Sequence, residues 1–227
     1  MTTHVNGDRF TAVLMRELLF LHGFSQIDPE TCSLLRAIRT ILPEAKIHAP
    51  SYHPNQSLAL TRIDHALETC RTIINNSPTK KLNVIGFSFG GLLAALFAAR
   101  YPELVNKVLL FAPAIDNFER NYADKPRESW TMPPTFVEAL QTYPARPPVT
   151  RPTTIVHGSL DNDEGGGSFW RIERWAQEQS FEEIYLLDGV DHSLEPWLSQ
   201  HTLNTPPPKE QPLPVWPITL RELLMRY

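Results

Sequence analysis

The sequence predicts an α/β fold with a mostly parallel central sheet of about six to seven strands and helices on both faces. Two observations lead to this fold class. Short apolar runs that suit buried strands alternate along the chain with helical segments, and this alternation is typical of parallel strands joined by right-handed crossovers. In addition, residues 81–100 pass directly from a strand-forming run into a helix-forming run rich in leucine and alanine.

The expected elements follow one another in a regular order. Strands are expected at Glu17–Leu21, Ala45–Ala49, Leu82–Ile85, Lys107–Phe111, Thr153–Val156 and Glu183–Leu187. Helices are expected at Thr31–Leu42, Leu58–Ile74, Leu92–Ala99, Thr135–Gln141, Phe169–Gln179 and Ile218–Tyr227. Because ligands of parallel sheets bind beyond the carboxyl ends of the strands, Gly23, Ser88 and Pro113 are expected to meet at one such edge.

Length and composition are those of an ordinary globular protein. The chain has 227 residues, of which 42% are hydrophobic and 20% are charged, and its net charge is −4. This balance indicates neither a nucleic-acid partner nor an anionic membrane. The first residues lack the apolar region of a signal peptide and no stretch is long enough to span a bilayer, so a cytoplasmic location is expected. Cys32 and Cys70 lie in apolar helical patterns and are expected to be buried thiols.

We expect residues 1–227 to form a single domain. Residues 114–151 combine aromatic side chains with prolines and are expected to cross the top of the sheet as a short lid-like insertion. Residues 205–227 form a Pro-rich tail and a terminal helix, expected to wrap back onto the core. A ligand for a proline-binding partner domain is the alternative for the Pro-rich part.

The segment Gly86-Phe87-Ser88-Phe89-Gly90 is a G-x-S-x-G pentapeptide between an expected strand and an expected helix. A serine at such a sharp turn has a strained backbone, and its hydroxyl is held above the sheet. The N–H of Phe89 would lie at a helix amino terminus, which favours negative charge. The alternative is an ordinary turn in which Ser88 only caps the helix.

Two later loops carry the groups that would activate a serine. Asp161 follows the strand Thr153–Val156, and His192 follows the strand Glu183–Leu187. A serine hydroxyl becomes a good nucleophile when a base takes its proton and a carboxylate orients that base. The order serine, acid, histidine is the order found in hydrolases of this topology.

With these residues the chain resembles the α/β-hydrolase superfamily, over about residues 16–195. The resemblance rests on four features in the order of the family: His22-Gly23, Gly86–Gly90, His157-Gly158-x-x-Asp161, and His192. It implies that Ser88 is the nucleophile, His192 the general base and then acid, and Asp161 the orienting carboxylate. It also implies an oxyanion hole made by the N–H groups of Phe24 and Phe89.

Some assignments stay open. Asp163 is an alternative to Asp161 as the acid, and Asp191 stands where the family often has glycine. The acidic residues Asp161, Asp163 and Glu164 are expected to form a solvated loop rather than a calcium site, so no metal and no cofactor are expected. His22 and His157 are expected to make structural hydrogen bonds. The other histidines are expected at the surface or in loops: His4, His48, His53, His65 and His201.

The resemblance implies a serine hydrolase of carboxylic esters or thioesters with small to medium apolar acyl groups, acting through an acyl-enzyme. The expected pocket is lined by Phe87, Phe118, Trp130, Met132 and Phe136. An acyltransferase, a peptidase and a C–C bond hydrolase are alternatives on the same residues, and a non-catalytic binding protein is an alternative of another class. The only expected partner is the small-molecule substrate. The oligomeric state and the natural substrate are left open.

Overall fold

The computed structural model describes residues 16–57, 61–115, 134–161, 169–181, 183–202 and 218–227. Its six strands form one sheet in the order β2-β1-β3-β4-β5-β6, and every neighbouring pair is parallel. The strands are β1 (Glu17–Leu21), β2 (Lys46–His48), β3 (Leu82–Phe87), β4 (Val105–Phe111), β5 (Thr153–Gly158) and β6 (Glu183–Leu187). The predicted fold class is therefore confirmed.

The helices connect these strands and follow the last one. They are α1 (Ser33–Ile41), α2 (Ile63–Asn76), α3 (Phe89–Arg100), α5 (Pro134–Gln141), α6 (Phe169–Gln179), α7 (Glu195–Thr202) and α8 (Leu220–Met225). Each expected helix is present, with its ends shifted by a few residues. The helix α7 was not expected, because Pro196 interrupts its pattern, but proline is well tolerated in the first turn of a helix.

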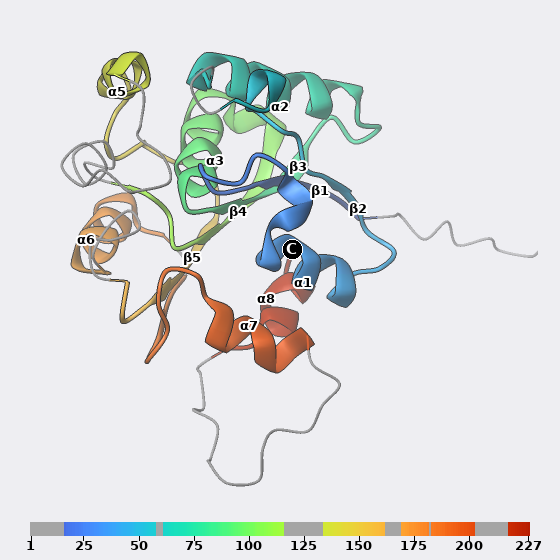
Figure 1. The fold of residues 1–227 in the computed structure, drawn as a ribbon, viewed down its shortest axis with the longest axis vertical. Helices are drawn as coiled ribbons and strands as arrows, with labels where there is room; N and C mark the ends of the chain where they lie inside the picture. The colour runs from blue at the N-terminus through green and yellow to red at the C-terminus, as the bar shows by residue number, and fades with distance from the viewer. Residues whose placement is uncertain (1–15, 58–60, 116–133, 162–168, 182, 203–217) are drawn as a thin grey trace, which may run out of the picture.

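The sheet is covered by helices on both faces (Figure 1). Successive side chains of a strand point to opposite faces, so the apolar run of β1 serves two cores. Leu19 and Leu21 pack in the core that contains residues of α2, α3, α5 and α6. Leu18 and Phe20 pack in the core that contains residues of α1, α7 and α8. Burial on both faces explains why the strands are continuous apolar runs rather than alternating ones.

The strand order reverses direction beside β1. The chain passes from β1 to β2 on one side and then returns to β3 on the other side. Right-handed crossovers therefore place α1 on one face and α2 on the opposite face. In such sheets the crevice for a ligand forms where the order reverses, beyond the carboxyl ends of the strands. The loops after β1 and β3 border that point.

The remaining expectations concern the two cysteines, membrane-spanning helices, and the lid and tail segments. Cys32 and Cys70 are both buried and free, as expected. Among the described helices none has the length and apolar character needed to cross a membrane. The aromatic part of the expected lid, residues 116–133, and most of the Pro-rich tail, residues 203–217, lie outside the described residues.

Candidate active site

Ser88 lies at a sharp turn between β3 and α3. Its backbone has φ 54° and ψ −121°, a region that non-glycine residues rarely adopt. Both main-chain polar groups of Ser88 are held by the segment that includes the end of β4. Its N–H donates to the Phe111 carbonyl at 2.9 Å, and its carbonyl accepts from the Ala114 N–H at 3.0 Å. These bonds keep the strained turn in place.

The glycines of the pentapeptide allow the helix to approach the sheet. A Cβ atom at Gly90 would lie 2.1 Å from the Leu21 carbonyl oxygen, at the end of β1. A Cβ atom at Gly86 would lie 2.4 Å from the Gly90 carbonyl oxygen. Neither distance is possible for a real side chain. The start of α3 can therefore lie against the ends of β1 and β3 only because glycine occupies both positions.

The loops that carry Asp161 and His192 are joined by main-chain hydrogen bonds. The Ser159 N–H donates to the Leu187 carbonyl at 2.9 Å, and the Leu160 N–H donates to the Val190 carbonyl at 2.9 Å. The two loops approach so closely that a Cβ atom at Gly158 would lie 2.2 Å from the Val190 carbonyl oxygen. This contact sets the distance between the acid and the histidine.

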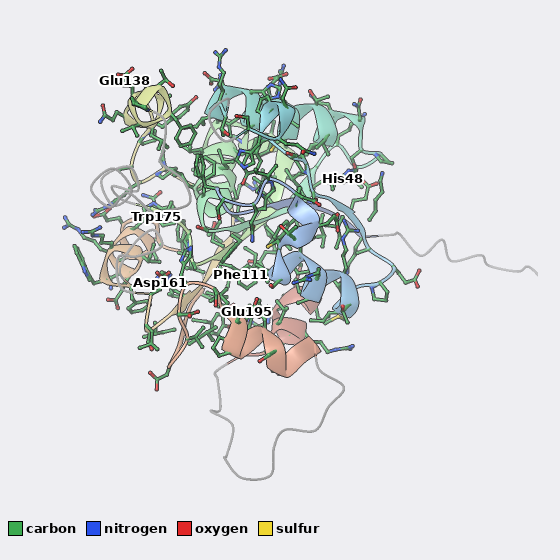
Figure 2. The ribbon with its side chains drawn as sticks, viewed as in Figure 1. His48, Phe111, Glu138, Asp161, Trp175 and Glu195 are labelled. Carbon is green, nitrogen blue, oxygen red and sulfur yellow. The ribbon has the colours of Figure 1, made fainter. Side chains whose placement is uncertain are left out.

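The side chains of Ser88, His192 and Asp161 form one line of hydrogen bonds. His192 Nε2 lies 2.8 Å from Ser88 Oγ, and His192 Nδ1 lies 2.8 Å from Asp161 Oδ2. A carboxylate can only accept, so Nδ1 carries the proton and Nε2 is the acceptor that faces the serine hydroxyl. The Asp161 side chain is 1% exposed and that of His192 is 26% exposed. Figure 2 labels Asp161 beyond the end of β5.

Three neighbouring residues complete the surroundings of Asp161 and His192. His157 is fully buried, and its Nε2 lies 3.5 Å from Asp161 Oδ2. The Phe87 ring stacks on the His192 ring, with centroids 5.5 Å apart. The Asp191 carboxylate is engaged by Ser193, whose N–H and hydroxyl donate to its Oδ1 at 3.0 and 2.6 Å. Asp191 thus supports the turn that leads into α7.

Phe24 and Phe89, the expected oxyanion residues, lie side by side at the reversal point of the sheet. Phe24 belongs to the loop after β1, and Phe89 is the first residue of α3. Their rings meet edge to face with centroids 5.3 Å apart. Side chains from segments far apart in the sequence therefore meet at this point.

A cleft with a volume of about 400 Å³ opens beside His192. Its described lining includes Gln26, Leu34, Phe87, Leu160, Asp161, Asp191, His192 and Glu195. Glu195 is labelled in Figure 2 at the start of α7. Gln26 and Leu160 were not expected to face this cleft. Their place directly beyond β1 and β5 is the signal that could have pointed to them.

The expected pocket residues do not all lie in the same place. Phe87 lines the cleft beside His192. Phe136 is not part of that lining, and its ring packs against Phe24 and Phe89, with centroids 4.8 and 5.5 Å away. It lines a second cavity of about 440 Å³ between α2 and α5. Phe136 faces this cavity because α5 packs against the start of α2 and not over the loop that carries His192. Phe118, Trp130 and Met132 lie outside the described residues.

Two histidines near this site have depressed pKa values. Burial lowers the pKa of His22 to about 4. Burial, and secondarily the charge of His22, lowers the pKa of His53 to about 4. His53 lies in a loop, as expected, but it is buried rather than at the surface.

Within the described ranges, no group of three or more His, Cys, Asp or Glu side chains could hold a metal ion. Asp163 and Glu164 fall outside those ranges.

A family model described as the alpha/beta hydrolase fold matches residues 18–135. This range is more than half of the chain. The chain belongs to the alpha/beta hydrolase fold family. The matched range includes His22-Gly23 and Ser88, whereas Asp161 and His192 lie beyond it.

Solved structures of this family are similar to the chain over most of its length. Est1E from Butyrivibrio proteoclasticus matches with a TM-score of 0.63 and 16% identity, over 82% of this chain and 83% of that one. The alpha/beta hydrolase domain-containing protein 10 from mouse matches with a TM-score of 0.58 and 16% identity, over 81% of this chain and 87% of that one. At this identity the likeness concerns the fold alone.

One curated relative matches over a shorter stretch. The 1-acylglycerol-3-phosphate O-acyltransferase ICT1 of Saccharomyces cerevisiae is 32% identical over 68 residues, which are 30% of this chain and 17% of the yeast protein. The match thus spans about a sixth of that protein.

Proposed function

We propose that this alpha/beta hydrolase is a serine hydrolase that cleaves carboxylic esters or thioesters of small to medium apolar acyl groups. The observation that carries the proposal is the line of hydrogen bonds from Ser88 through His192 to Asp161, each 2.8 Å long. The family membership and the strained turn at Ser88 support the same chemistry.

The proposed reaction has two halves. Ser88 Oγ attacks the carbonyl carbon while its proton passes to His192 Nε2, and a tetrahedral anion forms. The N–H groups of Phe24 and Phe89 stabilise this anion, and loss of one such donor typically costs about 3–4 kcal/mol. The ester or thioester bond then breaks, and the leaving alcohol or thiol takes the proton from His192. Water, deprotonated by His192, finally releases the acid from Ser88.

The cleft is lined by Asp161 and His192 but not by Ser88, and in this proposal it receives part of the substrate. Its volume of about 400 Å³ lies near the lower end of the range for small-molecule sites. Phe87, Leu34 and Leu160 make part of its wall apolar. We expect a series of p-nitrophenyl esters to give the highest kcat/KM at short or medium acyl length.

The decisive test is labelling with a fluorophosphonate probe, combined with hydrolysis of a p-nitrophenyl ester. The wild-type protein should be labelled at Ser88, and Ser88→Ala should lose both labelling and nearly all turnover. Ser51→Ala is the matched control, because Ser51 is an exposed serine outside the cleft, and it should keep both. Absence of labelling would favour a non-catalytic binding protein, and wild-type turnover by Ser88→Ala would exclude Ser88 as the nucleophile.

An acyltransferase is the second candidate, and the match to the yeast O-acyltransferase favours it. The same acyl-enzyme would then pass its acyl group to an alcohol instead of water. Adding an alcohol acceptor during ester turnover distinguishes the two. An acyltransferase gives mainly the new ester, whereas a hydrolase gives mainly the free acid at low acceptor concentration.

A further inference from the structure

A cluster of buried polar aromatic residues lies behind the loop that follows β1. It consists of His22, from that loop, and Tyr52 and His53, from the loop after β2. Their exposed fractions are 0%, 1% and 3%. The proposed reaction uses none of these side chains. Burying several polar groups is costly unless they are hydrogen-bonded, so their contacts indicate what the cluster does.

Tyr52 holds His22 in two ways. The two rings stack with centroids 4.1 Å apart and planes 6° from parallel. The Tyr52 hydroxyl also donates a hydrogen bond to the main-chain carbonyl of His22. His53 supports the same loop from the side, because its ring meets the Phe24 ring edge-on with centroids 5.7 Å apart. The residue His22 is therefore fixed through both its ring and its backbone.

His22 in turn holds the carbonyl group of Gly23. His22 Nδ1 lies 2.9 Å from the Gly23 carbonyl oxygen. Burial keeps the imidazole neutral at pH 7, since it lowers the pKa to about 4, and a proton on Nδ1 makes this contact a donated hydrogen bond. The same carbonyl accepts from the Gln26 N–H at 3.2 Å, while the Gly23 N–H donates to Gln26 Oε1 at 2.9 Å.

The Gly23 carbonyl and the Phe24 N–H belong to one peptide unit. A trans peptide is planar, so its N–H points opposite to its carbonyl. The groups that hold the Gly23 oxygen therefore also set the direction of the Phe24 N–H. Stabilisation of a developing anion depends on donors already aimed at it, and a small misalignment lowers the rate strongly.

We propose that Tyr52 is a positioning residue that aims the Phe24 N–H at the reacting carbonyl oxygen, acting through His22 and the Gly23 carbonyl. This inference rests on the proposed function, in which the Phe24 N–H stabilises the tetrahedral anion. The hydroxyl of Tyr52 matters because it fixes His22 at its backbone, whereas the ring alone holds only the imidazole plane.

The test is Tyr52→Phe, which removes the hydroxyl and keeps the stacked ring. Tyr227→Phe is the matched control, because the Tyr227 hydroxyl is also buried and donates to a main-chain carbonyl, that of Val108, at 3.0 Å. Both variants lose one buried hydrogen bond, so both should lower Tm by about 2–4 °C. Only Tyr52→Phe should change the chemistry.

For Tyr52→Phe we expect kcat on a p-nitrophenyl ester to fall about tenfold, with KM within about twofold of wild type. Affinity for an alkyl trifluoromethyl ketone, which forms a tetrahedral anion on the serine, should fall by the same factor as kcat/KM. Tyr227→Phe should keep the wild-type kcat and ketone affinity. A purely structural role of Tyr52 would lower Tm in both variants and leave both quantities unchanged.

A second variant covers the case in which Tyr52→Phe does not fold. His22→Phe keeps an aromatic ring against Tyr52 but removes the Nδ1 donor to Gly23, and it should show the same selective loss of kcat. Wild-type kcat and ketone affinity in the folded variant would overturn the inference. The proposed function is judged separately: it stands if the probe labels Ser88 and Ser88→Ala is inactive, whatever the result at Tyr52.

Discussion

Ser88 shows how a single residue can be forced into an unfavourable conformation by its neighbours. A residue held in a sparsely populated backbone region costs about 1–3 kcal/mol. Here the conformation is held by hydrogen bonds from both main-chain groups of Ser88 to residues at and just beyond the end of β4. The strain therefore belongs to the assembled sheet and not to the pentapeptide alone. Such a turn presents the hydroxyl to the histidine loop.

Asp161, the proposed acid, gives a prediction at the residue scale. Asp161→Asn should lower kcat by about 10⁴-fold, because an amide no longer holds His192 in the tautomer that accepts the serine proton. Its fold should be preserved, since the two side chains have nearly the same shape. The measurement is ester hydrolysis together with the rate of fluorophosphonate labelling.

Asp163→Asn is the control for this prediction, and it should retain wild-type turnover. The opposite pattern, with activity lost at Asp163 and kept at Asp161, would assign the role of the acid to Asp163. The two carboxylates are two positions apart in the sequence, and each substitution removes one negative charge, so the comparison holds overall charge constant.

At the scale of elements, the site depends on how closely loops and strands approach. Gly158 ends β5 and faces the Val190 carbonyl in the loop after β6. This contact brings the acid loop against the histidine loop, so it controls the geometry between Asp161 and His192. Glycine is required here because of space, not because of an unusual backbone angle.

Gly158→Ala should therefore lower kcat more than its effect on the stability of the fold would suggest. Its Cβ would lie 2.2 Å from the Val190 oxygen, and relief of the clash moves the histidine loop. Displacements of about 1 Å cost about 100-fold in rate, so we expect at least this loss in kcat. Ester kinetics and thermal unfolding measure the two effects separately.

Gly189→Ala, in the loop after β6, is the matched control. Gly189 has φ +70° and no heavy atom within 4 Å of an added Cβ. The substitution should cost about 1–2 kcal/mol of stability through its backbone angle while kcat stays near wild type. Equal losses of kcat in both variants would show that loop flexibility, and not the contact at Gly158, controls the site.

At the scale of the whole molecule, the strand order brings distant loops to one place. The loops after β1, β3, β5 and β6 all leave the same edge of the parallel sheet. The reversal of direction beside β1 places the His22–Phe24 loop next to the Ser88 turn. The two cores lie on opposite faces of the sheet, and the cluster of His22, Tyr52 and His53 is buried near this edge.

This burial predicts how stability depends on pH. His22 and His53 have pKa values of about 4 in the folded protein, against about 6.5 in an unfolded chain. Between these values the unfolded state binds protons that the folded state does not. The free energy of unfolding should therefore be fully maintained above pH 6.5 and fall as the pH drops toward 4, by up to about 3 kcal/mol for each histidine.

Urea denaturation at several pH values between 7.5 and 4.5 measures this loss. His53→Gln should reduce the difference between pH 7 and pH 5 by roughly half. His65→Gln, at an exposed position on α2, should leave it unchanged and serves as the control. An unaltered pH dependence in His53→Gln would contradict the assignment to the buried histidines.

The sequence by itself determined the elements and the chemistry-bearing positions. Apolar periodicity is a local property, so the six strands and the helices between them could be predicted from runs of a few residues. The placement of Ser88, Asp161 and His192 directly after strands followed from the same reading, because parallel strands end at one edge. The helix α7 was missed, since Pro196 obscured its start.

Only the tertiary structure decided what these residues touch. The distance between Ser88 and His192, which are 104 positions apart, depends on strand order and on the contact at Gly158. The burial of His53 and Tyr52, and the packing of Phe136 against Phe24, depend on how α2 and α5 pack. Local patterns encode the conformation of each segment, whereas contacts between distant loops arise only when the cores are filled and the sheet is assembled.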